Sequence, residues 1–358
     1  MESKNASLDE ILLKFASGEL VSQSDREKLE FWLLKDDLRA KAFGITADNV
    51  AEVMQARSHL FQAIYPKVMA FCQTKGFRSE ATILATLWHL WLPLAQQIAQ
   101  KRQKLGYPLI QGILGAQGTG KTTLAAILIL ILAHLGYRTL SLSLDDLYKT
   151  YAERQSLQAQ DPRLIWRGPP GTHDVDLGVA VLDRLRQQQG AIAIPRFDKS
   201  AWGGIGDRAT PEIVENIDIV LFEGWFVGVR PIDPAAFDTA PPPIITASDR
   251  AFARDINTKL QDYLPLWERL APLIVLHPVD YRLSQQWRRQ AEQEMIASGK
   301  TGMSDQMIDQ FVAYFWRSLH PDLFIKPLIG NPNWVDVVIE INQDHSLGVV
   351  YRPGDRLT

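Results

Sequence analysis

The sequence predicts an α/β protein with a mostly parallel sheet covered by helices on both faces, preceded by an N-terminal helical region. Three observations predict it. Residues 1–100 have helical patterns throughout, and residues 107–280 alternate between apolar, strand-like runs and helical runs. A glycine-rich octapeptide also joins the first of these strands to the helix that follows. Such alternation is typical of parallel strands buried on both sides, so we expect two parts, residues 1–100 and 101–358.

The N-terminal part is expected to be helical from its first residues. Ser7-Leu-Asp-Glu10 has the form of a capping box, in which a serine and a glutamate bind the free N–H groups at a helix start. Leucines recur at helical spacing between Ala81 and Gln100. Pro93 lies inside that pattern, so we expect a kink or a break there.

The α/β part is expected to contain five strands before its C-terminal segment. Their ranges are 109–114, 138–144, 191–195, 218–222 and 272–276. The helices between them include 121–135 and 175–189. Gly136 and Gly190 follow these helices, where a glycine commonly ends a helix, and Asp174 precedes the second, where an aspartate commonly caps it.

The C-terminal segment is expected to begin with two helices, 281–298 and 304–317, which form a candidate lid around residues 281–317. The lid interpretation rests on the basic residues there, because closure of a lid brings positive charge to a reacting phosphate without admitting water. The run Trp334-Val-Asp-Val-Val-Ile-Glu-Ile341 then predicts a last strand, and residues 348–351 are a candidate partner for it.

Composition argues against several classes of function. A formal net charge of −3 gives no electrostatic footprint for nucleic acid or for an anionic membrane surface. The single cysteine, Cys72, cannot form an intrachain disulfide, which fits a reducing compartment. The polar, acidic N-terminus shows no targeting peptide, and the longest apolar run, 124–133, is too short to span a bilayer. We expect a soluble, cytoplasmic protein.

Residues 115–122, Gly-Ala-Gln-Gly-Thr-Gly-Lys-Thr, form a complete phosphate-binding loop between a strand and a helix. Gly115 and Gly120 allow a tight turn that points successive N–H groups at phosphate oxygens, and the helix start adds its positive dipole. Lys121 can reach the β- and γ-phosphates, and the Thr122 hydroxyl can bind Mg²⁺. The residues expected to bind the nucleoside triphosphate are Gly115, Ala116, Gln117, Gly118, Thr119, Gly120, Lys121, Thr122 and Thr123.

Two of the expected strands end in carboxylates. Asp145 and Asp146 follow the strand at 138–144, where a carboxylate can accept the proton of an attacking hydroxyl. A helix cap or a solvated turn would also use such aspartates. Glu223 ends the strand that starts after Asp218, at the place where a nucleotide fold positions a carboxylate to orient Mg²⁺. Asp218 itself is interpreted as a turn residue.

Basic residues gather in two segments rather than along one helix face. These are Arg196, Lys199 and Arg208, and then Arg282, Arg288 and Arg289. Transfer of a phosphoryl group needs such positive charge, although most surface arginines are simply solvated. An Asn-Lys-x-Asp segment for guanine is missing, because the nearest match, residues 257–260, lacks the acid. This argues against a GTPase switch.

The order of these motifs resembles the kinases that include uridine kinase, phosphoribulokinase and pantothenate kinase, and more closely the plant-type D-glycerate 3-kinases found also in cyanobacteria. The resemblance runs from about residue 80 to the end and rests on residues 143–148, 167–174, 194–202, 206–208, 222–225, 287–292 and 302–305. The sequence departs from the family at Pro169-Pro170 and at Leu147, which can reshape the acceptor pocket. The first 75 residues carry no such resemblance.

The resemblance implies a P-loop kinase fold and ATP-dependent phosphorylation of the 3-hydroxyl of D-glycerate to 3-phosphoglycerate, the closing step of photorespiratory carbon recovery. In our hypothesis Thr122 binds Mg²⁺ directly, and Glu223 or Asp145 binds it through water. Asp145 is the general base, and Arg288 moves toward the phosphates as a lid residue. An arginine fork suits the carboxylate of glycerate. The residues expected around the acceptor are Asp146, Tyr148, Arg167, His173, Arg196, Asp198, Lys199 and Arg208.

Two alternatives remain open. A kinase of the same fold can act on another small alcohol, such as a nucleoside or a sugar phosphate, although a second phosphate would need more basic residues than residues 167–208 supply. The protein can also be an ATP-binding module that offers its N-terminal helices to a protein partner. Lys121, Asp145 and Glu223 together argue against pure binding, because a binder needs no base.

Overall fold

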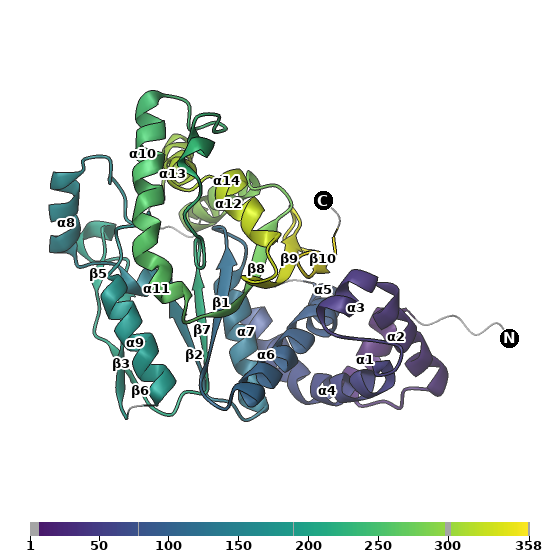
Figure 1. Cartoon of the computed structure of the whole chain (residues 1–358). Coiled ribbons are helices and arrows are strands. Elements are labelled where there is room, and N and C mark those ends of the chain that lie inside the picture. Colours follow the sequence, from purple (N-terminus) through teal and green to yellow (C-terminus); the bar gives the residue numbers. More distant parts are fainter. Residues whose placement is uncertain (1–6, 78, 189, 298–301, 357–358) are drawn as a thin grey trace.

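A computed structural model describes residues 7–77, 79–188, 190–297 and 302–356 of the chain. Its centre is a six-stranded sheet in the order β10-β9-β8-β1-β7-β2 (Figure 1). Every neighbouring pair is parallel except β9 and β10, which are antiparallel. The strands are β1 Leu109–Gly115, β2 Thr139–Ser143, β7 Ile219–Gly224, β8 Ala271–Pro278, β9 Val335–Ile341 and β10 Leu347–Tyr351. The predicted fold class is confirmed.

Helices come before the sheet and between its strands. The first group is α1 Leu8–Ser17, α2 Gln23–Lys35, α3 Asp37–Ala42, α4 Val50–Thr74, α5 Glu80–Thr86 and α6 Leu92–Leu105. The second is α7 Lys121–His134, α8 Tyr151–Gln160, α9 Val175–Gln187, α10 Ala247–Lys259, α11 Leu264–Trp267, α12 Leu283–Ala297, α13 Asp305–Ser318 and α14 Pro321–Ile329. Short 3-10 turns occupy Leu144–Leu147, Trp202–Gly204, Pro234–Phe237 and Leu260–Tyr263. No helix of the described residues is long and apolar enough to cross a membrane.

The N-terminal helices share one core with the sheet. Alternate residues of a strand face opposite sides, so Ile219 and Leu221 of β7 pack against α7 and the helices α1–α6. Val220 and Phe222 face the other layer, which contains α9, α10 and α13. In Figure 1 the N-terminal helices lie on one side of the sheet and α8–α11 on the other. The N-terminal region is therefore built into the protein and is not a separately packed attachment.

The capping box at the start of α1 is confirmed, and the helix around Pro93 shows how a proline is accommodated. The chain passes from α5 to α6 through a π-helical turn, Leu87–Trp91, and Pro93 lies in the first turn of α6. A π turn would bond the Trp88 carbonyl to the N–H that proline lacks. Arg57 donates to this carbonyl instead, at 3.4 Å. The α-helical pattern is therefore interrupted just before Pro93, where we expected a kink or a break, and the chain stays helical through the π turn.

The strand predicted at 191–195 forms as β3 (Ile192–Ile194), but its expected place in the parallel sheet and the predicted cap at Gly190 are wrong. β3 pairs antiparallel with β6 (Glu212–Val214), outside the central sheet. A second small ladder joins β4 (Phe197–Asp198) to β5 (Asp207–Arg208). Helix α9 ends at Gln187, and Gln188 takes the left-handed conformation expected of Gly190. The last residues of the predicted helices 175–189 and 281–298 lie outside the described residues.

Candidate active site

The carboxyl ends of β1, β7 and β2 meet at one edge of the sheet. In the strand register Glu223 lies beside Ile113 on one side and beside Ser143 on the other. The phosphate loop follows β1, and Asp145 follows β2 after only one intervening residue. The topology therefore brings the loop, Glu223 and Asp145 together, as the sequence predicted.

The phosphate loop is folded by its glycines, each for its own reason. Gly118 and Gly120 have φ angles of +81° and +86°, a region that other residues rarely adopt. Gly115 is needed for space, because a Cβ there would lie 2.6 Å from Oγ1 of Thr119. The sequence analysis assigned the tight turn to Gly115 and Gly120, so the role of Gly118 was missed. A Cβ on Gly118 would also lie 2.8 Å from Cβ of Trp287, which shows how closely α12 packs on the loop.

The groups expected to bind phosphate and metal lie together at the start of α7. Nζ of Lys121 donates to the carbonyl of Ala116 at 3.0 Å, so the side chain lies over the loop. Burial lowers the pKa of Lys121, opposed by the charges of Glu223 and Asp145. The Thr122 hydroxyl donates to Oε1 of the buried Glu223 at 3.1 Å. A hydroxyl beside a carboxylate is the oxygen donor set that Mg²⁺ prefers when phosphates and water complete its shell.

No three-residue cluster of His, Cys, Asp or Glu that could hold a metal ion occurs among the described residues. Mg²⁺ in phosphoryl-transfer enzymes is held by one or two carboxylates together with substrate phosphates. Thr122 and Glu223 fit that description. Asp145 remains a further candidate ligand.

Asp145 is positioned as a charged acceptor. Its Oδ2 accepts from Nζ of Lys199 at 2.6 Å, and its side chain is 29% exposed. Burial alone would raise the pKa of Asp145, but Lys199 and the hydroxyl of Tyr148 bring it below its ordinary value. The carboxylate is therefore ionised at neutral pH, the form that a general base needs.

Asp146, the neighbouring carboxylate, is used for structure. Its Oδ2 accepts from the backbone N–H of Ser143 at 3.0 Å and from Nη1 of Arg196 at 2.9 Å. Arg196 also binds Glu212 and the carbonyl of Ser141. The structure thus places Asp146 and Arg196 in a network that holds the β3–β6 segment, and both guanidinium edges of this arginine already have partners.

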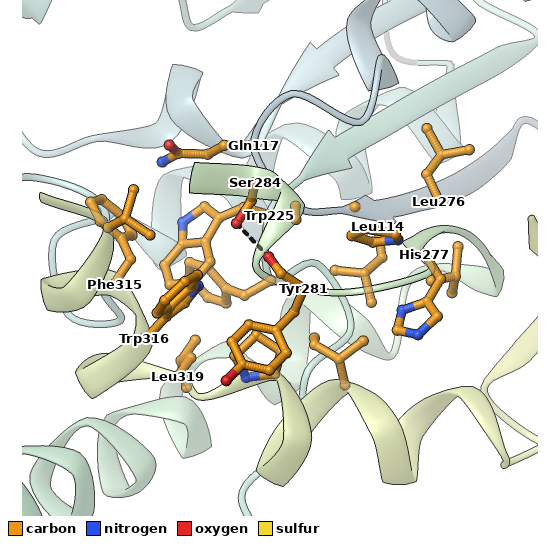
Figure 2. Close-up of a pocket in the computed structure, with 18 residues that line it drawn as sticks. Leu114, Gln117, Trp225, Leu276, His277, Tyr281, Ser284, Phe315, Trp316 and Leu319 are labelled. Atoms are coloured by element: carbon orange, nitrogen blue, oxygen red, sulfur yellow. Dashed lines mark hydrogen bonds between the residues drawn. The ribbon is translucent and has the colours of Figure 1, made fainter. Parts of the chain in front are cut away.

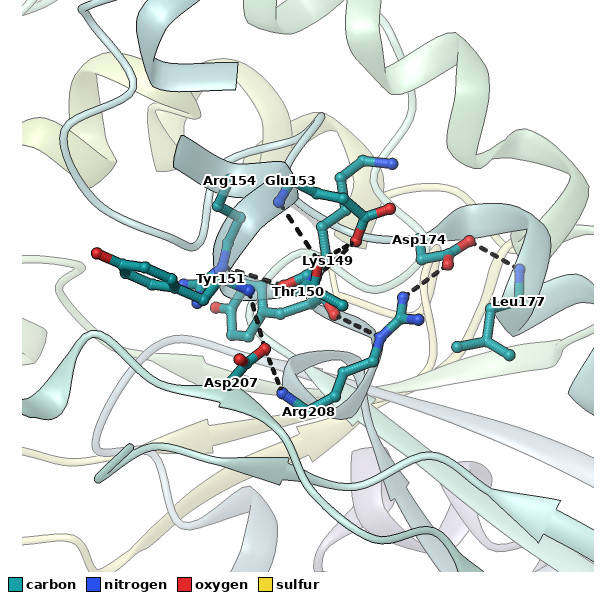
Figure 3. A network of polar contacts seen from close by, with 10 residues as sticks. Lys149, Thr150, Tyr151, Glu153, Arg154, Asp174, Leu177, Asp207 and Arg208 are labelled. Carbon is teal, nitrogen blue, oxygen red and sulfur yellow. Dashed lines mark hydrogen bonds and ion pairs between the residues drawn. The ribbon is translucent and has the colours of Figure 1, made fainter. Parts of the chain in front are cut away.

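Arg208 is engaged in a second network, at the start of α9 (Figure 3). Its Nη2 donates to Oδ2 of Asp174 at 2.6 Å, and its Nε donates to the carbonyl of Tyr148 at 3.3 Å. Oδ1 of Asp174 caps α9 by accepting from the N–H of Leu177 at 3.0 Å, as predicted. Arg208 therefore ties β5 to this helix.

The remaining acceptor candidates are spread over the same loops. Nη1 of Arg167 donates to the carbonyls of Gly204 and Ile205, at 2.9 and 2.6 Å. In the part of the chain that the structure describes, Arg167 has no ion pair with a carboxylate. Asp198 is exposed and accepts two bonds from Ser200, which makes it a turn residue here.

His173 and Tyr148 form a buried pair close to Asp145. Their backbones are bridged, and their rings stack with centroids 4.5 Å apart. Nδ1 of His173 lies 2.8 Å from the hydroxyl of Tyr263, whereas its Nε2 is buried without a partner among the described residues. The sequence analysis missed Tyr263, since nothing in its helical surroundings signals a polar contact 90 residues away.

An apolar pocket lies on the other side of the loop, and no sequence motif predicted it (Figure 2). Its floor contains Leu114, Gly115 and the end of β8, and α12, α13 and α14 cover it. Its aromatic walls are Trp225, Tyr281, Phe315 and Trp316. Phe315 and Trp316 lie on α13, whose apolar spacing resembles that of any amphipathic helix, whereas Trp225 follows β7 and Tyr281 precedes α12.

The predicted lid residue Arg288 lies on α12. It pairs with Glu292 at 2.5 Å and lies over the ring of Phe311, with 5.3 Å from the guanidinium carbon to the ring centroid. Among the described residues its guanidinium makes no hydrogen bond or ion pair with the phosphate loop, although its neighbour Trp287 packs on Gly118. Its part in a lid therefore stays a prediction.

The parallel sheet, the glycine loop and the carboxylates at the strand ends define a P-loop kinase. No family model matches the chain. It is 31% identical over 252 residues to an uncharacterized kinase, mug58, of Schizosaccharomyces pombe, covering 66% of this chain and 90% of that protein. The chain therefore belongs to the P-loop kinase family that contains this fungal kinase and D-glycerate 3-kinase.

Two proteins to which the chain is similar are D-glycerate 3-kinases. The chain is 29% identical over 286 residues to the chloroplastic D-glycerate 3-kinase of Arabidopsis thaliana, covering 73% of this chain and 60% of that protein's length. The solved structure of D-glycerate 3-kinase from Cryptococcus neoformans var. grubii matches with a TM-score of 0.66 at 26% identity. That match covers 73% of this chain and 98% of the fungal one.

Proposed function

We propose that the protein is a kinase that transfers the γ-phosphoryl group of ATP to the 3-hydroxyl of D-glycerate. The observation that carries the proposal is the ionised Asp145 carboxylate at the same sheet edge as the phosphate loop and Glu223. The similarity to two D-glycerate 3-kinases, from Arabidopsis thaliana and Cryptococcus neoformans, supports D-glycerate as the acceptor. The loop residues 115–123 bind the phosphates of ATP through backbone N–H groups and through Lys121.

The chain's own residues supply positioning and charge. Thr122 and Glu223 would hold Mg²⁺, which, when bound, neutralises charge on the transferring phosphate. Lys121 binds the β- and γ-phosphates, where the developing negative charge gathers. Asp145 accepts the proton of the attacking hydroxyl.

The carboxylate of the acceptor needs a cationic side chain that is not already ion-paired with a carboxylate of the protein. Arg196 and Arg208 are paired with Asp146 and Asp174. Among the described residues Arg167 donates to backbone carbonyls and lies over the ring of Phe197, but it has no carboxylate partner, and the exposed Lys199 is paired with Asp145. We therefore assign the carboxylate of glycerate to the Arg167 fork, with Lys199 as the neighbouring point charge.

The test is product formation from ATP with a panel of acceptors. We expect ADP release with D-glycerate, little with L-glycerate, and 3-phosphoglycerate as the product by mass spectrometry and NMR. The variant D145N serves as the catalytic control, because it should bind ATP but not turn over. Turnover with a nucleoside or a sugar phosphate and none with D-glycerate would contradict the acceptor. ATP binding with no acceptor turned over would favour the binding module.

The apolar pocket beside the loop favours one second candidate. D-Glycerate is small and polar, so it would make few favourable contacts with a pocket walled by Trp225, Phe315 and Trp316. A larger alcohol with an apolar portion would fill this space and still present a hydroxyl to Asp145. The same panel should therefore contain nucleosides and aryl-substituted alcohols, whose turnover relative to D-glycerate decides between the two.

A further inference from the structure

The imidazole ring of His173 is packed between three aromatic rings. Its ring stacks on Tyr148 at an interplanar angle of 22°, and Phe226 and Tyr263 meet it edge-on. Its side chain is enclosed, with the residue only 2% exposed. The packing fixes the plane of the ring and hence the direction in which each ring nitrogen points.

The hydrogen bonds of Tyr263 determine which nitrogen of His173 carries the proton. The Tyr263 hydroxyl oxygen accepts from the backbone N–H of Gly171 at 2.9 Å. Its own proton needs an acceptor, and the His173 ring is the only acceptor in hydrogen-bond contact with it among the described residues. The hydroxyl proton then points to Nδ1 of His173, 2.8 Å away. Because Nδ1 accepts, the proton of the neutral ring is on Nε2.

The Nε2–H group is a donor without an acceptor. It is buried and has no partner among the described residues. Buried donors are nearly always paired, so an unpaired one in a fixed ring calls for an oxygen supplied by a ligand. Burial lowers the pKa of His173 to about 3, so the ring stays neutral and keeps this proton at any working pH.

The unpaired donor lies on the acceptor side of the site. Tyr148, stacked on the ring, bonds through its hydroxyl to Asp145. The backbone of His173 is bridged to that of Tyr148, three residues after Asp145 in the chain, and the charge of Asp145 opposes the lowering of the pKa of His173 by burial. His320 provides the contrast: it is equally buried, but its Nε2 bonds to the Pro242 carbonyl at 3.0 Å and its Nδ1 to the N–H of Asp322 at 3.2 Å.

We propose that His173, held in its Nε2–H form by Tyr263, donates a hydrogen bond to an oxygen of the acceptor that does not itself react. Resting on the proposed function, this makes His173 a specificity-determining residue for alcohols that carry a second oxygen next to the attacked hydroxyl, such as 2,3-dihydroxy acids. Tyr263 is a positioning residue that acts through His173. The mechanism needs no proton transfer to or from the imidazole.

The test compares acceptors that each lack one oxygen-bearing group. For D-glycerate, 3-hydroxypropanoate lacks the 2-hydroxyl, and propane-1,2-diol lacks the carboxylate. The wild-type protein should prefer D-glycerate to both. H173L removes the donor and should lower kcat/KM for D-glycerate by roughly 10- to 100-fold, the usual effect of a lost buried hydrogen bond, while the KM for ATP is unchanged. Its preference over one of the two analogues should fall by the same factor.

Conservative variants separate specificity from folding. H173Q places an amide N–H near the position of Nε2 and should restore much of the preference. H320L, the matched control, loses a buried histidine whose nitrogens are satisfied, so it should lower the melting temperature and leave acceptor preference alone. ATP binding by each variant confirms that it is folded. Unchanged preference of H173L over both analogues would overturn the proposal.

The tautomer is measured without any turnover. In ¹⁵N NMR spectra of the wild-type protein, His173 should show a protonated Nε2 and an unprotonated Nδ1, and Y263F should shift the ring toward the Nδ1–H form. If D-glycerate proves not to be an acceptor, this readout still stands, and the oxygen-deletion comparison is repeated with the acceptor that does turn over. An Nδ1–H tautomer in the wild-type protein would sink the inference by itself.

Discussion

The two sides of the phosphate loop differ in chemistry although both lie at the same edge of the sheet. Toward β7 and β2 the loop faces charged side chains: Glu223, which accepts from the Thr122 hydroxyl, and Asp145, which is paired with Lys199. Toward β8 it faces an aromatic pocket beneath α12–α14. Under the proposed function, the difference would confine charge to the side where the alcohol attacks, and the apolar side would keep water away from the γ-phosphate.

The largest expected effect comes from D145N on the charged side. Removing the base should lower turnover by roughly 10²- to 10⁴-fold with ATP affinity nearly intact, because the amide keeps the shape but not the charge. Turnover by coupled ADP release and binding by calorimetry measure the two quantities. D146N is the comparison: its carboxylate binds Arg196, so its main effect should be a lower melting temperature. Wild-type turnover in D145N together with collapse in D146N would move the base to Asp146.

K121M should follow, with a loss of roughly 10²- to 10³-fold in kcat, because one preorganised cation no longer meets the transferring phosphate. The folded protein should be unaffected, since Nζ of Lys121 binds only the carbonyl of Ala116 among the described residues. Steady-state kinetics at saturating ATP gives the effect. The exposed Lys104 on α6 supplies the control K104M, which should behave as wild type.

E223Q is expected to have a smaller effect, which should depend on magnesium. Glu223 accepts from the Thr122 hydroxyl, so the amide would weaken the metal site by roughly 10- to 100-fold in affinity or activity. A titration of activity against Mg²⁺ should show the half-saturation point moved upward, with partial recovery at high concentration. A variant with an unaltered Mg²⁺ curve would remove Glu223 from the metal site.

The smallest effect tests the apolar side. W316A opens one wall of the pocket, so we expect ATP hydrolysis without an acceptor to rise by a few-fold as water gains access. Transfer to the alcohol should change little, because the charged side is untouched. Comparing ADP release with and without acceptor measures the coupling. Tight coupling in W316A would contradict the shielding role of this side.

Local signals in the sequence predicted most of the fold. The phosphate loop, the strands beside it and the caps at Ser7 and Asp174 depend on nearby residues, and the structure agrees. The β3 segment was misplaced because a short apolar run does not reveal its pairing partner. The partner of β3 is β6 (Glu212–Val214), which pairs with it antiparallel outside the central sheet.

The candidate site was harder to predict because its decisive contacts are long-range. The sequence indicated which arginines are available but not that Arg196 and Arg208 are held by Asp146 and Asp174. Tyr263 lies in no motif, and among the aromatic walls Tyr281, Phe315 and Trp316 lie in none either, whereas Trp225 ends the segment 222–225. Their significance arises from side chains that meet only after the sheet and helices have packed.

The arrangement of α7 has a consequence for how the whole chain responds to heat. This helix starts in the phosphate loop and packs against α4 and α6. A nucleotide that binds the loop should therefore also stabilise the N-terminal helices. By linkage, the temperature at which these helices melt should rise with the fraction of protein that has nucleotide bound. A spectroscopic probe on the N-terminal helices would then detect nucleotide binding at the distant phosphate loop.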